Sequence, residues 1–179
     1  FNANRIWADL AYAALLGGNT DSWIDALAFF SSTRKYGDES TIDNYGTDAL
    51  SMESYGAARL KMLQYKGHNG KSLRVKPGLL IVGPRNEGIA FDILKNQRRL
   101  TAEIVGSGEN AKTLTGAIEN RYAGTAEVVV STELDKEWFL ADVSSPVKPV
   151  AVQKRREPKL TRLDSDNDEN VVMRGEYIY

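Results

Sequence analysis

The sequence predicts an α+β fold, because helical and strand-like patterns follow one another along a chain about as long as one domain. Three segments carry apolar residues at the three- and four-residue spacing of amphipathic helices. Short apolar runs bounded by glycine or proline lie between and after them, as expected for strands. Apolar residues make up 42% and charged residues 26% of the 179 residues, which is typical of a chain that buries a core.

The first predicted helix covers residues 4 to 16 and ends at Gly17-Gly18. Residues 19 to 48 are irregular and polar, so they predict a long loop. Within this loop, Phe29-Phe30 is predicted to anchor the chain on the core, since aromatic side chains bury large areas. The apolar face of the helix is formed by Ile6, Trp7, Leu10, Ala11, Ala14 and Leu15.

The second predicted helix begins at Ser51, a favourable N-cap residue, and continues to Gly67. The sequence Gly67-His68-Asn69-Gly70 predicts a turn after it. Residues 73–75 and 79–82 are short apolar runs bracketed by glycine and proline, and they predict extended segments. A third helix is predicted to open at Asn86 and Glu87, with an apolar face of Ile89, Ala90, Ile93 and Leu94.

The second half of the chain predicts further strands. Residues 105 to 124 are polar and contain glycine, so they are predicted to be a connection. Residues 126–131 and 138–143 are strand-like, and the turn residues 133–137 between them predict a hairpin. Pro146 and Pro149 indicate that the next extended segment is an edge strand or starts late.

Several classes of site are excluded by the residues that the sequence lacks. There is no cysteine, so disulfides, thiolate metal sites and a cysteine nucleophile are absent. His68 is the only histidine, which excludes sites that need two imidazoles. The longest uncharged apolar run, residues 10 to 16, is too short to span a bilayer. A net charge of −1 favours neither nucleic acid nor an anionic membrane as a partner of the whole chain.

One segment ends like a nucleotide-binding P-loop, with Gly70, Lys71 and Ser72. Tyr65 stands where the first glycine of that motif is required, and a predicted helix precedes the segment where the motif has a strand. No helix N-terminus is predicted to face a phosphate there. An ordinary hairpin turn is therefore the preferred interpretation.

A second glycine-containing segment, residues 83 to 88, lies between a predicted strand and a predicted helix, where free backbone N–H groups could meet an anion. It lacks the spacing of a dinucleotide-binding loop, and Glu87 would repel a phosphate. Helix capping is the preferred interpretation of this segment.

An acidic run copies the start of a calcium-binding loop, with Asp164, Asp166 and Asp168 at alternating positions. Glu169 stands where such a loop needs glycine, and Gly175 stands where it needs the closing glutamate. A solvated acidic turn is therefore the preferred interpretation.

Residues 148 to 162 form a basic stripe with a local net charge of +5, since only Glu157 opposes Lys148, Lys154, Arg155, Arg156, Lys159 and Arg162. Such a stripe could bind phosphate groups. No aromatic residue is interleaved for base stacking, so pairing with the acidic residues 164 to 169 is preferred. None of the 24 carboxylates is singled out as part of a glycosidase-like pair, and we predict no catalytic, cofactor or metal site.

A set of short segments along the chain carries a family resemblance. In the second half these are residues 124–131 (GTAEVVVS), 137–142 (EWFLAD), 146–149 (PVKP), Gln153, 168–174 (DENVVMR) and Glu176-Tyr177. In the first half they are Leu50-Ser51, residues 69–73 (NGKSL) and residues 76–84 (KPGLLIVGP). Together they closely resemble the major head subunit of Mu-like phages and prophages. The resemblance extends from Phe1 to Tyr179, with residues 1 to 48 the least distinctive.

The resemblance implies the Hong Kong 97-type capsid fold, with residues 4 to 16 as the end of its long spine helix. Residues 1–49 are then expected to be part of the peripheral domain, residues 50–141 the axial domain, and residues 142–179 a return to the peripheral domain. The family has an N-terminal arm and an extended hairpin loop before the spine helix and more chain after the position of Tyr179. We therefore expect this sequence to be part of a longer chain, and we do not expect it to close a shell alone.

The resemblance further implies a structural protein, not an enzyme and without a cofactor, that assembles with its own copies into capsomers and an icosahedral shell enclosing DNA. The implied partners are scaffold, protease, portal and accessory head proteins, with packaged DNA contacted non-specifically at most and no membrane. The implied location is the virion, after assembly in the bacterial host cytoplasm. The alternatives are an encapsulin-like shell that encloses cargo proteins and, from another class, a small-ligand or nucleotide-binding enzyme that uses the glycine-containing turns.

Overall fold

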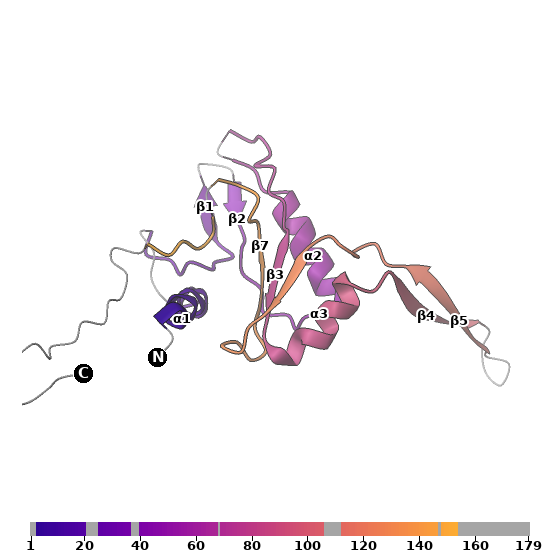
Figure 1. Ribbon diagram of the computed structural model, residues 1–179. Helices are drawn as coiled ribbons and strands as arrows, with labels where there is room; N and C mark the ends of the chain where they lie inside the picture. Colours follow the sequence, from indigo (N-terminus) through magenta and orange to yellow (C-terminus); the bar gives the residue numbers. More distant parts are fainter. Residues whose placement is uncertain are drawn as a thin grey trace, which may run out of the picture.

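The computed structural model describes residues 3–20, 25–36, 40–67, 69–105, 112–146 and 148–153. In chain order they form α1 (Ala3–Gly17), β1 (Arg34–Tyr36), β2 (Ser40–Ile42), α2 (Met52–Leu63), β3 (Leu79–Val82), a short 3-10 helix (Pro84–Asn86), α3 (Glu87–Leu94), β4 (Arg98–Val105), β5 (Lys112–Glu119), β6 (Glu127–Val130) and β7 (Trp138–Ala141) (Figure 1). This mixture of helices and mainly antiparallel strand pairs agrees with the predicted α+β class. None of the described helices is long and apolar enough to cross a membrane.

The central sheet contains three strands in the order β6, β3, β7. β3 runs parallel to β6 and antiparallel to β7, with Leu80 opposite Val128 on one side and Leu140 on the other. The predicted hairpin between residues 126–131 and 138–143 is therefore wrong, although both segments are strands. The physical reason is the burial of β3: Leu80 and Val82 are 0% exposed, and a strand so deep in the protein needs hydrogen-bond partners along both edges.

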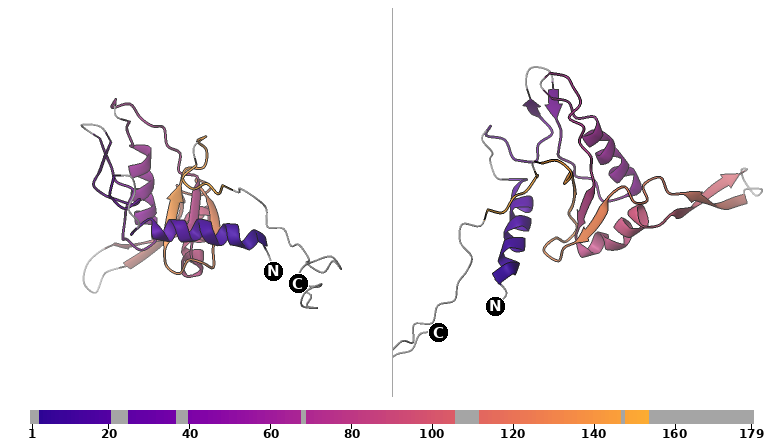
Figure 2. Two further views of the ribbon diagram at one scale, coloured as in Figure 1. Left: turned by 90° about the vertical axis from the view of Figure 1, so that its left-hand side faces the viewer. Right: turned by 45° about the horizontal axis from the view of Figure 1, so that its top comes forward.

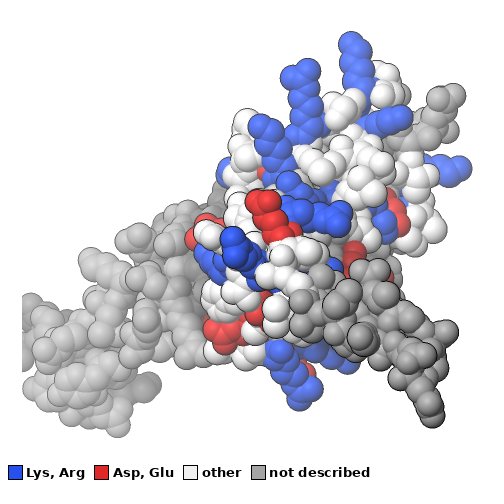
Figure 3. Space-filling model, turned by 90° about the vertical axis from the view of Figure 1, so that its right-hand side faces the viewer, with Lys and Arg blue, Asp and Glu red and all other residues white. Residues whose placement is uncertain are grey.

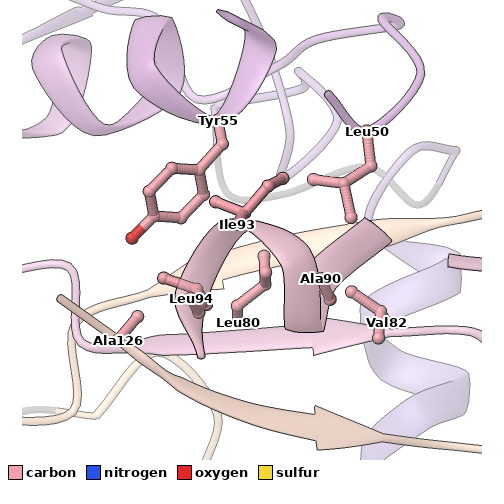
Figure 4. Close-up of a cluster of buried hydrophobic side chains, with 8 residues drawn as sticks. All are labelled: Leu50, Tyr55, Leu80, Val82, Ala90, Ile93, Leu94 and Ala126. Carbon is pink, nitrogen blue, oxygen red and sulfur yellow. The ribbon is translucent and has the colours of Figure 1, made fainter. Parts of the chain in front are cut away.

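The core lies between β3 and the helices α2 and α3 (Figure 4). Side chains alternate along a strand, so Leu80 and Val82 both point toward α3. Tyr55 enters from α2, and its hydroxyl forms a hydrogen bond of 2.9 Å with the Thr125 hydroxyl, which satisfies its polar end. The buried cluster consists of Leu50, Tyr55, Leu80, Val82, Ala90, Ile93, Leu94 and Ala126.

The structure confirms the predicted start of α2. The Ser51 hydroxyl accepts a hydrogen bond from the backbone N–H of Ser54 (3.1 Å), and the Ser54 hydroxyl accepts one from the backbone N–H of Ser51 (2.8 Å), which is a capping box. The helix ends at Leu63, before the predicted Gly67. Its end comes earlier because the chain after it pairs with the returning segment, where the N–H of Leu73 donates to the carbonyl of Tyr65 (2.9 Å).

The predicted loop of residues 19–48 contains one short antiparallel pair, β1 and β2, which the sequence pattern did not predict. Its predicted anchor is confirmed: the Phe30 ring lies 5.5 Å from the Phe139 ring of β7, centroid to centroid, and 5.1 Å from that of Phe29. α1 is helical as predicted, and it lies on the side of the sheet opposite α2 and α3 (Figures 1 and 2). The aromatic contact thus fastens the N-terminal part of the chain to the outer face of the sheet.

Asp142 holds the segment before β3 against the segment after β7. Its carboxylate accepts hydrogen bonds from the hydroxyl of Ser144 (2.6 Å), the backbone N–H of Ser144 (2.7 Å), the backbone N–H of Lys76 (2.9 Å) and the hydroxyl of Ser145 (3.1 Å). These donors favour the charged form, the Ser144 hydroxyl most of all, and they hold the pKa of Asp142 well below its usual value.

We expect Asp142→Asn to lower stability at neutral pH and to remove part of the acid sensitivity of the fold. A carboxyl whose pKa is lower in the folded chain stabilises that state fully above its unfolded pKa, near 3.8, and the contribution is lost progressively as the pH falls from that value toward the lower pKa of the folded chain. Urea unfolding at pH 7 and at about pH 3 should show a smaller difference between variant and unaltered chain at the lower pH. Asp48→Asn, at an exposed carboxylate, is the control. An equal difference at both pH values would contradict this assignment.

Candidate functional site

The segment that ends like a P-loop is a closed hairpin turn over its described residues. Lys66 and Ser72 pair as a β-bridge, the N–H of Gly67 donates to the carbonyl of Lys71 (2.8 Å), and the N–H of Gly70 donates to the carbonyl of Gly67 (2.9 Å). Gly70 has φ +70°, which favours glycine at this position. The turn interpretation is thus confirmed. The N–H groups of Gly67 and Gly70, which a bound phosphate would need, already donate to carbonyls within the turn. The next helix along the chain begins only at Pro84, so this turn does not lead into a helix N-terminus as a P-loop does.

We expect no binding of ATP or GTP at Gly70, Lys71 and Ser72. Isothermal titration calorimetry at millimolar nucleotide is the measurement, with Lys71→Ala as the comparison because this side chain would reach the terminal phosphate. Heat of binding in the unaltered chain that disappears in Lys71→Ala would overturn this expectation.

The second glycine-containing segment, residues 83 to 88, joins two connections of the fold. Asn86 is the N-cap residue of α3, as the capping interpretation predicts, but its side chain forms no cap hydrogen bond with the helix. Instead, its side-chain amide donates to the carbonyl of Lys136 (2.7 Å), and the N–H of Gly83 donates to the carbonyl of Glu137 (3.2 Å). Asn86 is nearly buried, so its amide is used for a tertiary contact between the turn after β3 and the β6–β7 connection. The role of this segment is structural, as predicted, but through a different contact.

The two charged runs of the C-terminal part lie almost wholly outside the described residues. These are the calcium-loop-like run at Asp164, Asp166 and Asp168 and the basic stripe from Lys154 onward, and their interpretations stay predictions. Lys148 is the described member of the stripe, and its ammonium donates to the carbonyl of Val143. Within the described ranges, no three histidine, aspartate or glutamate side chains gather in a way that could hold a metal ion.

A long antiparallel ribbon of β4 and β5 extends away from the body of the protein (Figures 1 and 2). Eight residue pairs join its strands, from Arg98 opposite Glu119 to Val105 opposite Lys112, which gives a length of about 27 Å. The prediction of a connection without strands over residues 105–124 is therefore wrong for β5. Leu100 is 83% exposed and Ile118 43% exposed, so the ribbon carries apolar side chains that the described part of the same chain does not cover.

A sequence signal for this ribbon exists, and it is weak. Apolar or small residues alternate with polar ones at Leu100, Ala102 and Ile104 and again at Leu114, Gly116 and Ile118. Threonine in both strands and Gly116 in β5 reduce the contrast of the pattern.

The base of the ribbon is held firmly by Asn120, a residue that sequence reasoning did not single out. Its side-chain amide donates to the carbonyls of Ile93 and Asn96 (both 2.8 Å), and its backbone N–H donates to the carbonyl of Gln97 (2.9 Å). Asn120 is 4% exposed, and it satisfies carbonyls at the C-terminus of α3 that the helix itself cannot pair. The ribbon therefore leaves the body at a fixed point and is not a loose loop at its base.

An exposed ribbon with apolar side chains, on a body with a small closed core, is typical of a subunit that associates with other proteins. The comparison with family models identifies which kind of subunit it is. Residues 42–134 and 112–179 match the family described as Mu-like prophage major head subunit gpT. The chain belongs to this family, which confirms the predicted resemblance and supports a structural role as a major capsid protein of a phage head. No curated protein and no solved structure gave a match.

Proposed function

We propose that this protein is a self-assembling shell subunit of the Hong Kong 97 type, and that the shell is icosahedral and encloses DNA. The observation that carries the proposal is the match to the head-subunit family over residues 42–179. The α+β body is compatible with this fold, and the uncovered ribbon supports an assembling subunit. We infer no catalytic activity and no cofactor, since head subunits of this family are structural.

We propose the domain organisation that the resemblance implies. Residues 1–49 would be part of the peripheral domain, with α1 as the end of the spine helix, residues 50–141 the axial domain, and residues 142–179 a return to the peripheral domain. The distribution of the core supports a separate axial unit, because all eight residues of the buried cluster lie between Leu50 and Ala126. The proposed mechanism is heterologous association, in which different patches of neighbouring copies meet and close into a ring around an axis.

The ribbon has a physical reason to contact a neighbouring copy. A two-stranded ribbon is marginally stable in water when nothing covers it. Because Leu100 is exposed, its side chain contributes little hydrophobic free energy to folding until another surface covers it. A copy that covers this side chain would stabilise both the ribbon and the capsomer.

The wider partners follow from the same role. Scaffold, protease, portal and accessory head proteins would act during assembly in the bacterial host cytoplasm, and the finished subunit would reside in the virion. Packaged DNA would be contacted without sequence preference. An encapsulin-like shell is the second candidate on the same fold, and the content of the particle distinguishes the two, since one encloses DNA and the other cargo proteins.

We expect the complete gene product to form closed particles in negative-stain electron microscopy. Residues 1–179 alone are expected to give a monomer or a small, concentration-dependent oligomer in light scattering, because we expect each contact of these residues alone to bury less than about 1,200 Å², where association is weak. Closed particles from residues 1–179 alone would show that these residues are sufficient for assembly. A complete product that never assembles would refute the proposed function.

A further inference from the structure

The charges of this chain are distributed very unevenly along its sequence. Residues 54–86 carry seven cationic side chains and no carboxylate, whereas the remaining residues carry 16 cations and 24 carboxylates, a net charge of −8. The seven cations are Arg59, Lys61, Lys66, Lys71, Arg74, Lys76 and Arg85. One continuous segment of α2 and the chain after it is therefore of opposite charge to the rest.

Some of these cations are used inside the chain. The Lys61 ammonium pairs with Asp43 (2.7 Å), the Arg85 guanidinium pairs with Asp135 (2.7 Å), and the Arg59 guanidinium donates to the carbonyl of Pro77 (3.0 Å). The other four are exposed and form no ion pair with any described residue: Lys66, Lys71, Arg74 and Lys76. Figure 3 shows lysine and arginine side chains gathered over the upper part of the face that it draws. The end of α2 and the turn after it lie at the same height, at the top of Figure 1.

The same region exposes large apolar side chains. Leu60 and Leu63 of α2 are 56% and 44% exposed, and Leu73 in the returning segment is 47% exposed. A shallow depression lined by Leu63, Gln64, Lys66 and Ser72 joins the helix to the turn, so Leu63 and Lys66 share one surface. We name this surface the basic face and define it as Leu60, Leu63, Lys66, Lys71, Leu73 and Arg74.

We propose that the basic face docks onto carboxylate-bearing surface outside residues 54–86 of a second copy of this chain, an inference that rests on the proposed function because it names one contact between subunits. Among the described residues outside 54–86, 14 carboxylates oppose 10 cations, and this excess of negative charge supplies the complement to the unpaired cations. The leucines favour a protein over the phosphates of DNA, because contacts with phosphate oxygens leave apolar side chains exposed to water. The contact joins two different patches, which is the geometry that builds rings from identical subunits.

The test is the self-association of residues 1–179 measured by sedimentation velocity, from about 10 μM to about 1 mM. Lys66→Glu/Lys71→Glu reverses two unpaired cations of the basic face, and Lys95→Glu/Lys136→Glu changes the net charge equally at two exposed lysines outside residues 54–86. We expect association to weaken at least about tenfold in the first variant and to stay within about twofold of the unaltered chain in the second. Raising the salt from about 50 mM to about 500 mM should weaken the association of the unaltered chain.

A second pair of variants separates the leucines from the charges. Leu60→Ser/Leu63→Ser should also weaken association, and because both side chains are about half exposed, thermal melting should change little. An unaltered chain that stays monomeric at about 1 mM, or equal association in both charge variants, would overturn the inference while particle formation by the complete gene product still tests the proposed function. Duplex DNA binding that is lost in Lys66→Glu/Lys71→Glu while self-association is unchanged would also overturn it and assign the basic face to phosphate.

Discussion

Gly83→Ala is expected to lower the free energy of unfolding by about 3 kcal/mol or more, which is a large fraction of the stability of an ordinary single domain. A β-carbon built on Gly83 would lie 2.0 Å from the carbonyl oxygen of Asp135 and 2.6 Å from its carbonyl carbon. These are backbone atoms, so no side-chain rotation relieves the overlap. The two connections would have to separate, and this would break the hydrogen bonds from Gly83 to Glu137 and from Asn86 to Lys136.

The measurement is urea unfolding of the variant beside Gly88→Ala. Gly88 lies in α3 with open space within 4 Å of the position that a β-carbon would take, so alanine there should be neutral or should stabilise the helix by up to about 1 kcal/mol. The two substitutions add the same methyl group to the same stretch of chain, and only the space differs. If Gly83→Ala were as stable as Gly88→Ala, the close crossing of the two connections would be wrong.

Leu80→Ala is expected to cost about 3 to 5 kcal/mol of stability. Leu80 is 0% exposed at the centre of β3, and its side chain lies under α3 within the buried cluster, so truncation leaves a cavity that neighbouring strands cannot easily close. The core of this chain is small, and the loss of one large member removes a considerable part of its burial.

Leu60→Ala is the matched control, because it removes the same atoms from a side chain that is 56% exposed. Its cost should stay within about 1 kcal/mol. Urea midpoints at equal protein concentration measure both variants. Similar losses for Leu80→Ala and Leu60→Ala would contradict the position of the core between β3 and α3.

Local patterns were sufficient to predict several parts of this protein. The helices α1, α2 and α3 follow from their apolar spacing, the start of α2 follows from Ser51, and the turn at residues 67–70 follows from its glycine and asparagine residues. Each of these features depends on residues that are only a few positions apart, so the local sequence is enough to predict it. Family membership also follows from the sequence, because short segments such as residues 76–84 and 137–142 are specific without any folding argument.

Tertiary structure decided the features that join distant residues. The alternation of residues 126–131 and 138–143 shows that both are strands, but it contains no information on whether they pair with each other or with β3. Asn86 is a reasonable cap by its position, and only the β6–β7 connection 50 residues later explains why its amide is used elsewhere. The β4–β5 ribbon is hard to predict for a further reason: strand patterns are strong where a core selects them, and Leu100 and Ile118 of the ribbon are not covered by the described part of the chain.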